Sequence, residues 1–587
     1  MRSFLKFTLA TIVGLFISGL IFFLILVGIV SSASGEKITV VKAHSILLAK
    51  FDIPIVDRDS ENPFDQFDFG SFAMEGKLGL NRILENIEKA ATDENIDGIF
   101  LDLSVIPAGI ATLEEIRSAL VKFRESKKFI YAHADYYTQG SYYLATAADK
   151  IYLTPEGNLD WRGLRSQHIF FKKALDKLGI DPQVIRHGSY KSAAEPFILE
   201  KLSDENREQI TEYVGSIWDN FLLKISESRD IPVADLQKYA DDLTISNSKS
   251  AYEHKFVDSL IYFDEVLALL KKNTSTAEKD DLSAITMKKY IHAPKKRNTK
   301  GLVKDKIAVI YASGNIVTGE GDPNMIGSDK LSRVIREARR DSSIKAIVFR
   351  VNSGGGSALA SEVIWREVKL AAQAKPLIAS MGDVAASGGY YIVSPAKKIL
   401  ANANTITGSI GVIGLIPNGK SFMKDKLGIT SDVVKTNKHS DLGNFFRALE
   451  PEETELIRKE IGHIYDTFTS HVAEGRGMTQ EEVDKIGGGH VYSGADAKEI
   501  GLIDDFGGLK EAIELAAKEA GLETYRTIEM PKHEDPLETI IKQLSGEVRF
   551  RVLRTELGEN YRYYEQLKKI QQLQGIQAIM PFEIDVY

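Results

Sequence analysis

A serine at a strand-to-helix boundary and a lysine far before it in the chain are the residues best suited to do chemistry. Ser387 follows an apolar run and a turn of small residues, and Gly388 and Gly389 come directly after it. Such a turn exposes the hydroxyl, and the glycines let a substrate backbone approach N–H groups that can stabilise a developing negative charge. Lys191, within the motif GSYKSAAEP, offers an amine that could act as the base.

The chemistry of this pair requires an unusual lysine. A serine hydroxyl is a weak nucleophile that needs a base within ~2.6–3.2 Å, and an amine is a base only when it is neutral. The reference pKa of lysine is ~10.4, so Lys191 must be buried among apolar or cationic neighbours. Glu195 could neutralise the lysine by pairing with it, but we interpret Glu195 as structural. The competing role for Ser387 is that of a helix N-cap, which the two glycines after it disfavour.

Three other interpretations are open at this point. A Ser-His-Asp arrangement would need His439 or His490 beside Ser387, because these two histidines come closest to the motifs of the second half. The glycine loop Gly354–Gly356 would also suit a crotonase-like enzyme that stabilises a thioester enolate. A catalytically silent membrane scaffold is the third possibility. The pair Ser387 and Lys191 favours a peptidase over the last two, because neither of them needs both residues.

An internal repeat predicts the architecture. The segment IDGIFLDL from Ile96 matches IKAIVFRV from Ile344, which is an offset of 344 − 96 = 248 residues. Within each copy, short apolar runs (99–103, 129–132 and 151–153; 347–351, 377–380 and 399–401) alternate with segments of helical period (113–123; 359–372). Alternation of this kind predicts an α/β fold of parallel strands with right-handed crossovers.

The repeat also indicates which copy could be active. At this offset the partner of Ser387 is Gln139, and Ile106-Pro107-Ala108 stand opposite the three glycines. The first copy therefore lacks the nucleophile and the glycine loop, but it carries Lys191. We infer that each copy supplies half of one site, and the duplication favours assembly of that site within one chain.

Four motifs together resemble the signal peptide peptidase A family, long form, of the Clp protease/crotonase superfamily. They are GSYKSAAEP from Gly188, RVNSGGGS from Arg350, MGDVAASGGYYI from Met381 and GHVYSGADAKEIGLI from Gly489, and the likeness runs from about residue 40 to the end of the chain. One departure is Gly354, where the family usually has proline. The resemblance implies tandem Clp/crotonase-like domains and a serine endopeptidase that degrades cleaved signal peptides without metal or cofactor.

The resemblance also assigns roles to particular residues. It implies Ser387 as nucleophile, Lys191 as general base, and oxyanion donors in the backbone N–H groups of Gly388 and of Gly355 or Gly356. Ser409 falls where the family has a serine that orients the lysine amine. The family further implies a homo-oligomeric ring, a tetramer, around a central cavity.

The N-terminal sequence predicts a membrane anchor. Residues 7–30 are almost wholly apolar and follow Arg2 and Lys6, and 24 residues at 1.5 Å each are long enough to cross a bilayer core of ~30 Å. The basic flank places the N-terminus in the cytoplasm and the bulk of the chain on the outer, periplasmic side of the cytoplasmic membrane. The alternative is a removed signal peptide, for which residues 31–33 could be the cleavage site.

Composition and length limit the remaining possibilities. A net charge of −8 shows no basic excess that would suggest nucleic acid, and the absence of cysteine excludes disulfides and a thiol nucleophile. A chain of 587 residues exceeds one core. The expected divisions are a cytoplasmic start and transmembrane anchor (1–36), a first repeat with the lysine (37–270), a solvated linker (271–304), a second repeat with the serine (305–525) and a C-terminal extension (526–587).

Overall fold

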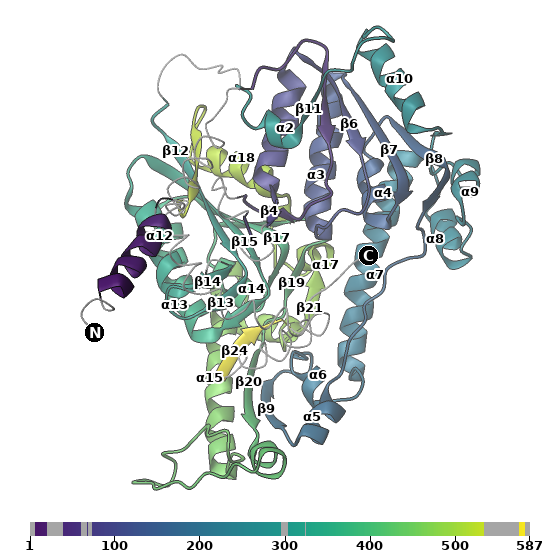
Figure 1. Ribbon diagram of the computed structural model, residues 1–587. Coiled ribbons are helices and arrows are strands. Elements are labelled where there is room, and N and C mark those ends of the chain that lie inside the picture. Colours follow the sequence, from purple (N-terminus) through teal and green to yellow (C-terminus); the bar gives the residue numbers. More distant parts are fainter. Residues whose placement is uncertain are drawn as a thin grey trace.

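Two α/β units lie side by side in the computed structural model (Figure 1). The structure describes residues 6–19, 21, 39–59, 67–68, 73–74, 76–294, 303–322, 324–532 and 575–580. The alternation of strands and helices predicted from the apolar runs is confirmed in both units.

The first unit is built on a six-stranded parallel sheet in the order β10-β8-β7-β6-β1-β11. Its central strands are buried along most of their length, as expected for a parallel sheet that is covered by helices on both faces. The strands are β1 (Ser45–Ala49), β6 (Ile96–Asp102), β7 (Phe129–Tyr137), β8 (Lys150–Leu159), β10 (Ser259–Leu260) and β11 (Ala284–Thr286).

The second unit has an eight-stranded sheet, which runs β21-β19-β17-β15-β12-β23, with β18 beside β17 and β22 beside β18. Only the β19–β21 pair of this sheet is antiparallel. The strands are β12 (Lys306–Ser313), β15 (Ile344–Ser353), β17 (Leu377–Ala386), β18 (Lys398–Ala401), β19 (Ile406–Gly408), β21 (Val491–Ser493), β22 (Asp505–Phe506) and β23 (Arg526–Met530).

The sequence repeat is visible as matching helices. Helices α2 (Leu80–Thr92) and α12 (Ser328–Arg340) begin 248 residues apart (328 − 80), as do α3 (Ile110–Phe123) and α13 (Ala358–Ala374). The match continues beyond the part that the sequence alone reveals, as two pairs of equal length show. They are α7 (Asp204–Arg229) with α15 (Pro451–Arg476), and α10 (Phe263–Asn273) with α18 (Leu509–Glu519).

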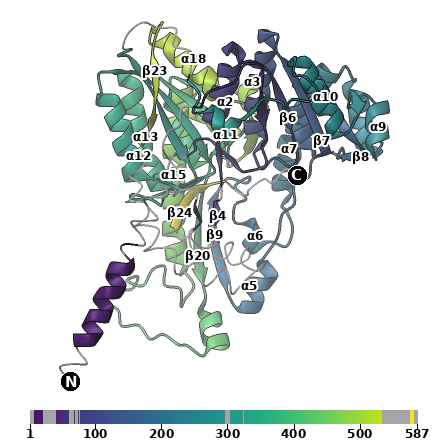
Figure 2. The ribbon, with the colours of Figure 1, turned by 45° about the horizontal axis from the view of Figure 1, so that its top comes forward.

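A third sheet joins the two units in the order β14-β13-β16-β24-β20-β9. Strand β9 comes from the first unit, and the other strands follow residue 304. Figure 2 shows β24, β20 and β9 near one another below the two main sheets. The strands are β9 (Asp181–His187), β13 (Asn315–Val317), β14 (Met325–Gly327), β16 (Gly355–Ser357), β20 (Val412–Asn418) and β24 (Gly575–Ile579).

One apolar cluster spans the two units, and a second lies within the second unit. The largest cluster of buried side chains includes Ile116 and Leu120 of α3 together with Val348 of β15 and Leu509 of α18. Thr112 adds a polar contact between the units, because its backbone N–H and its hydroxyl donate to Asp383 at 2.9 and 2.7 Å. The units therefore form one body, which holds distant parts of the chain in register.

Part of the stretch expected to be a solvated linker, 271–304, is folded. Strand β11 pairs with β1, and the helix that follows it, α11 (Met287–Tyr290), buries Met287 and Tyr290.

The remaining elements are short. These elements are β2 (Ile55–Val56), β3 (Phe67–Asp68), β4 (Ala73–Met74), β5 (Leu78–Gly79), α4 (Gln139–Ala145), α5 (Lys172–Leu178), α6 (Glu195–Ile198), α8 (Val233–Asp241), α9 (Ser248–Glu253), α11 (Met287–Tyr290), α14 (Gly388–Val393), α16 (Gln480–Ile486) and α17 (Gly494–Glu499).

The N-terminal segment begins with a helix over residues 6–19, which projects from the body (Figure 2). Its large apolar side chains are exposed, for example Phe7 and Phe16. None of the helices among the described residues is both long and apolar enough to cross a membrane. Much of the predicted anchor, residues 7–30, lies outside the described residues, so the anchor stays a prediction.

Candidate active site

The lysine and the serine singled out in the sequence meet within one chain, although 196 residues separate them. Lys191 Nζ donates to Ser387 Oγ at 2.7 Å, and it lies 3.0 Å from both the hydroxyl and the backbone carbonyl oxygen of Ser409. All three residues are 0% exposed. The arrangement places an amine and two hydroxyls in one buried site.

Burial sets the protonation of the lysine. It lowers the pKa of Lys191 well below the usual range, because an ammonium loses its hydration there. Glu195, which could have neutralised the amine, is engaged elsewhere: its carboxylate accepts from Asn206 Nδ2 at 2.8 Å and from Ser203 Oγ at 2.5 Å. An amine in this setting can accept the proton of the neighbouring hydroxyl.

Ser387 lies between the end of β17 and the start of α14. Its φ of 55° and ψ of −116° are strained for a residue with a side chain, and its hydroxyl makes no capping bond to α14. The strain is held by backbone bonds, since Ser387 N–H donates to the carbonyl of Gly408 at 2.8 Å. This backbone turns the hydroxyl toward Lys191 and away from the N-cap role.

Lys191 lies in the loop between β9 and α6, and two glycines of the second unit make room for it. Gly489 has φ of +88°, and a Cβ there would stand 2.6 Å from the Lys191 backbone nitrogen. A Cβ on Gly411 would stand 3.1 Å from Lys191 Cδ. The close contact between the loop and the second unit thus depends on positions without a side chain.

The glycine loop lies directly beside the serine. Gly355 and Gly356 have φ of +99° and +154°, and a Cβ on Gly355 would stand 2.7 Å from the backbone nitrogen of Gly388. Gly355 N–H is directed at Ser353 Oγ, at 3.1 Å. Of the two loop glycines, Gly356 is therefore the better candidate to act with Gly388 as an oxyanion donor.

Ser409 is held in a left-handed backbone conformation, with φ of 50°. Its backbone N–H donates to the carbonyl of His490 at 2.6 Å, which ties the turn after β19 to the segment before β21. This bond fixes the hydroxyl and the carbonyl that both accept from the lysine.

The two histidines of the alternative arrangement have other partners. His439 Nδ1 lies 3.0 Å from Glu453 Oε1, and His490 Nε2 lies 3.3 Å from Glu212 Oε2. Burial lowers the pKa of His490. In the part of the chain that the structure describes, the side-chain partner of Ser387 Oγ is the lysine. No group of three or more described His, Asp or Glu side chains is placed to hold a metal ion.

Sequence reasoning missed a glutamine that braces the lysine loop. Gln209, on α7, is fully buried; its Nε2 donates to the carbonyl of Tyr190 and to Ser192 Oγ, both at 3.1 Å, and its Oε1 accepts from Val491 N–H at 3.0 Å. It therefore joins the loop of the first unit to β21 of the second. A glutamine among the apolar positions of a long helix was the only signal available.

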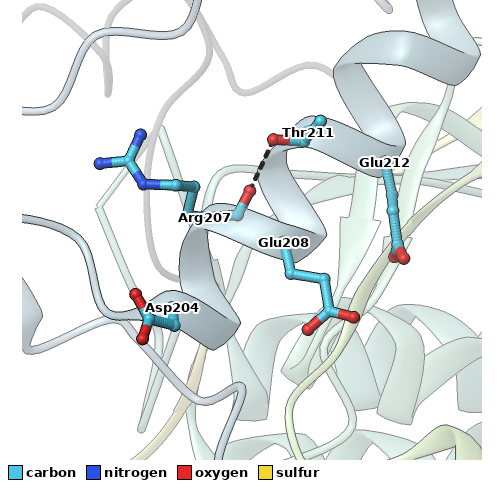
Figure 3. Close-up of a pocket in the computed structure, with 5 residues that line it drawn as sticks. All are labelled: Asp204, Arg207, Glu208, Thr211 and Glu212. Carbon is cyan, nitrogen blue, oxygen red and sulfur yellow. Dashed lines mark hydrogen bonds between the residues drawn. The ribbon is translucent and has the colours of Figure 1, made fainter.

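A surface pocket lies at the start of α7, lined by Asp204, Arg207, Glu208, Thr211 and Glu212 (Figure 3). Glu208 and Glu212 point to one side of the helix, and Arg207 points to another. Tyr190, next to the lysine, reaches this surface and donates to Glu208 at 3.1 Å. The pocket does not include Ser387 or Lys191, and we interpret it as a solvated face.

Comparisons of the sequence with known proteins identify one family. Residues 122–277 and 369–523 each match the family described as Peptidase family S49. Protease 4 of Salmonella typhi is 37% identical over 549 residues, which cover 90% of this chain and 87% of that protein. The chloroplastic serine protease SPPA of Arabidopsis thaliana is 34% identical, over 80% of this chain and 70% of that protein. Among solved structures, a point mutant of ClpP1 from Listeria monocytogenes is 16% identical with a TM-score of 0.24, over 35% of this chain and 94% of that one.

Proposed function

The chain belongs to peptidase family S49 and is a serine peptidase, and we propose that Ser387 is its nucleophile and Lys191 its general base. The family resemblance found in the sequence is confirmed by these matches. The observation that carries the proposal is the 2.7 Å contact between Lys191 Nζ and Ser387 Oγ in a buried site. Family membership leaves the crotonase-like enzyme and the silent scaffold without support.

The proposed reaction follows from the geometry. Neutral Lys191 takes the proton of Ser387 as its oxygen attacks the scissile carbonyl, and the backbone N–H groups of Gly388 and Gly356 stabilise the oxyanion. The lysine then gives the proton to the leaving amine, the C–N bond breaks, and water hydrolyses the acyl-serine with the lysine again as base. Ser409 orients the amine through the two 3.0 Å contacts.

We further propose that the substrates are cleaved signal peptides and that residues 7–30 tether the peptidase to the cytoplasmic membrane. An apolar peptide left in a bilayer is met most readily by an enzyme that is held at the same bilayer. The N-terminal apolar run and its basic flank support the tether, with the catalytic units on the outer side. A homo-oligomeric ring belongs to the same proposal and rests on the family resemblance.

Two single variants and their combination test the dyad. Ser387→Ala and Lys191→Ala should each lower kcat/KM for an apolar fluorogenic peptide by about 10³-fold or more, and the double variant should be no worse, because the two residues act as one unit. Lys201→Ala, which changes an exposed lysine, is the matched control and should stay fully active. Circular dichroism should show all four chains folded. If Lys191→Ala keeps more than about a tenth of the activity, the lysine is not the base, and His439→Ala and His490→Ala become the next assays.

The tether has a separate test. Alkaline phosphatase, which works only outside the cytoplasm, should be active when it is fused after Tyr587, and the chain should stay with the membrane fraction after a carbonate wash. Replacing residues 7–30 by a cleavable signal should release an active chain in soluble form. Recovery of the natural chain as a soluble protein that begins near Ser34 would contradict the tether.

A further inference from the structure

One strand of the third sheet pairs with the strand that carries the glycine loop. In the order β14-β13-β16-β24-β20-β9, strand β24 separates β16, which carries the glycine loop, from β20. It pairs antiparallel with both neighbours: Gly356 is the register partner of Ala578 on one side, and Ile413 is the partner of Gln577 on the other. Without β24 the two neighbours would leave a slot one strand wide, lined on both sides by backbone groups ready to pair. An extended peptide binds such a slot by adding a strand.

The carbonyl of Ala578 lies close to the two segments that carry the proposed oxyanion donors. A Cβ built on Gly355 would stand 2.0 Å from this oxygen, and one built on Gly388 would stand 2.9 Å from it. The same oxygen therefore approaches the two segments that carry the proposed donors, next to the nucleophile Ser387. Ala578 is 0% exposed, like Ser387 and Lys191. No second peptide can place its carbonyl there while β24 is in position.

Side chains hold β24 in the same site. Ile579 packs against Ala193 and Ala194, which follow Lys191 closely, and against Ile413 of β20. After the strand, Met580 N–H donates to the carbonyl of Gly354 at 2.6 Å. Gly354 stands where the family usually has proline, and a Cβ there would be 3.5 Å from Met580 Cβ. The segment thus makes the backbone and apolar contacts expected of a bound peptide.

We propose that β24 is an internal pseudo-substrate that keeps the peptidase inactive until it leaves the slot between β16 and β20. The inference rests on the proposed function of Ser387 and Lys191 and adds a means of regulating that function. A strand on the same chain competes at an effective concentration in the millimolar range, so a free peptide must bind well enough to displace it. The enzyme then responds to abundant or tightly bound peptides and spares others.

Peptide binding to chains that cannot cut tests the proposal without relying on catalysis. In a Ser387→Ala background, a fluorescein-labelled peptide of sequence GIQAIM, blocked at both ends, is titrated by fluorescence anisotropy against the full chain and a chain that ends at Gln574. The shortened chain should bind at least about tenfold more tightly. The peptide GIQPIM, in which proline replaces the residue at the Ala578 position, should bind neither chain well, because proline cannot pair as a central strand. Equal affinity of GIQAIM for both chains would overturn the proposal.

A point variant guards against a failure of folding. Ala578→Pro in the otherwise full-length, Ser387→Ala chain should weaken the pairing of β24 and raise affinity for the labelled peptide as the truncation does. If both altered chains instead lose their cooperative thermal transition along with binding, β24 is a structural strand and the proposal is wrong.

Kinetics separate this proposal from the one on which it rests. With Ser387 intact, the shortened chain should show a KM about tenfold lower for an apolar peptide and a kcat within about twofold, because only competition for the slot has been removed. If no chain hydrolyses peptides but the shortened one binds GIQAIM more tightly, the dyad assignment fails and the pseudo-substrate stands. If hydrolysis depends on Ser387 and Lys191 while KM is the same in both chains, the dyad stands and the pseudo-substrate fails.

Discussion

At the scale of single residues, the site combines a strained serine with a dehydrated lysine. Ser387 adopts φ of 55°, which costs about 1–3 kcal/mol and persists only because its neighbours hold it. Lys191 has exchanged water for two serine hydroxyls and one carbonyl, and its burial favours the neutral amine. Both features reduce stability and favour nucleophilic chemistry, as expected of a functional site rather than of a structural one.

The depressed pKa of Lys191 predicts how activity depends on pH. Since burial lowers this pKa and the working form is the deprotonated one, kcat/KM should rise with pH through the lowered value and then stay high. Lys191→Arg should be inactive across the range, because a guanidinium stays protonated below a pH of about 12. The measurement is a pH–rate profile between pH 5 and about 10, with the fold checked at each end. A fall at alkaline pH in a chain that is still folded would contradict the lysine base.

At the scale of elements, the sequence predicts the strands and helices that have a clear local pattern of apolar residues. The strands that carry Ser387 and the glycine loop are recognisable as apolar runs, and the repeat predicts which unit would supply each half of the site. The match between α7 and α15 is not found in the sequence, because the offset between the copies changes from 248 to 247 residues after the site loops, where the two copies differ most. Strand β24 is not predicted by the sequence, because five residues are too few to show a clear alternation of apolar and polar side chains. Its pairing also depends on strands more than 150 residues away.

Neither burial nor backbone strain could be read from the residues. A lysine looks the same in sequence whether it is solvated or enclosed by Gly411 and Gly489, which come from another unit. The left-handed conformation of Ser409 likewise depends on its bond to His490. Motif resemblance could therefore name site residues, whereas their chemical state depends on packing between segments far apart in the chain.

A buried ion cluster at the junction of the units offers a test at this scale. Arg350, on β15, is 0% exposed and lies 2.7 Å from Asp57 Oδ1 and 2.7 Å from Glu115 Oε1. Burial raises the pKa of Glu115, which shows how poorly solvated the cluster is. Arg350→Met should lower the free energy of unfolding by about 3–5 kcal/mol, because it leaves two buried carboxylates without their cation.

The matched control for this prediction is an exposed pair of similar geometry. Arg333 lies 2.7 Å from Glu320, with side chains 53% and 63% exposed, so Arg333→Met should change stability by less than about 1 kcal/mol. Urea denaturation of the two variants measures both values. A similar small effect at both positions would show that the cluster does not hold the units together.

At the scale of the whole molecule, duplication lets one chain build the proposed active site from two different copies. The copies share a core and a sheet, so the lysine loop of the first unit meets the serine of the second without a partner chain. One copy could then lose its nucleophile and glycine loop with no loss of function, provided that it kept the lysine. Gln209 and the contact between Thr112 and Asp383 keep the two halves in register.

This arrangement predicts the outcome of a mixing experiment. If Ser387→Ala and Lys191→Ala chains are dissociated, combined in equal amounts and reassembled, each chain still holds one defective half of its own site, so the mixture should be as inactive as its parts. Wild-type chains taken through the same cycle control for recovery, and mixtures of wild type with either variant should show activity in proportion to the wild-type fraction. A dyad shared between neighbouring chains would behave differently, since some interfaces would then pair an intact lysine with an intact serine. Activity that appears in the mixture would place the working site between chains, and it would do so without changing which two residues carry it.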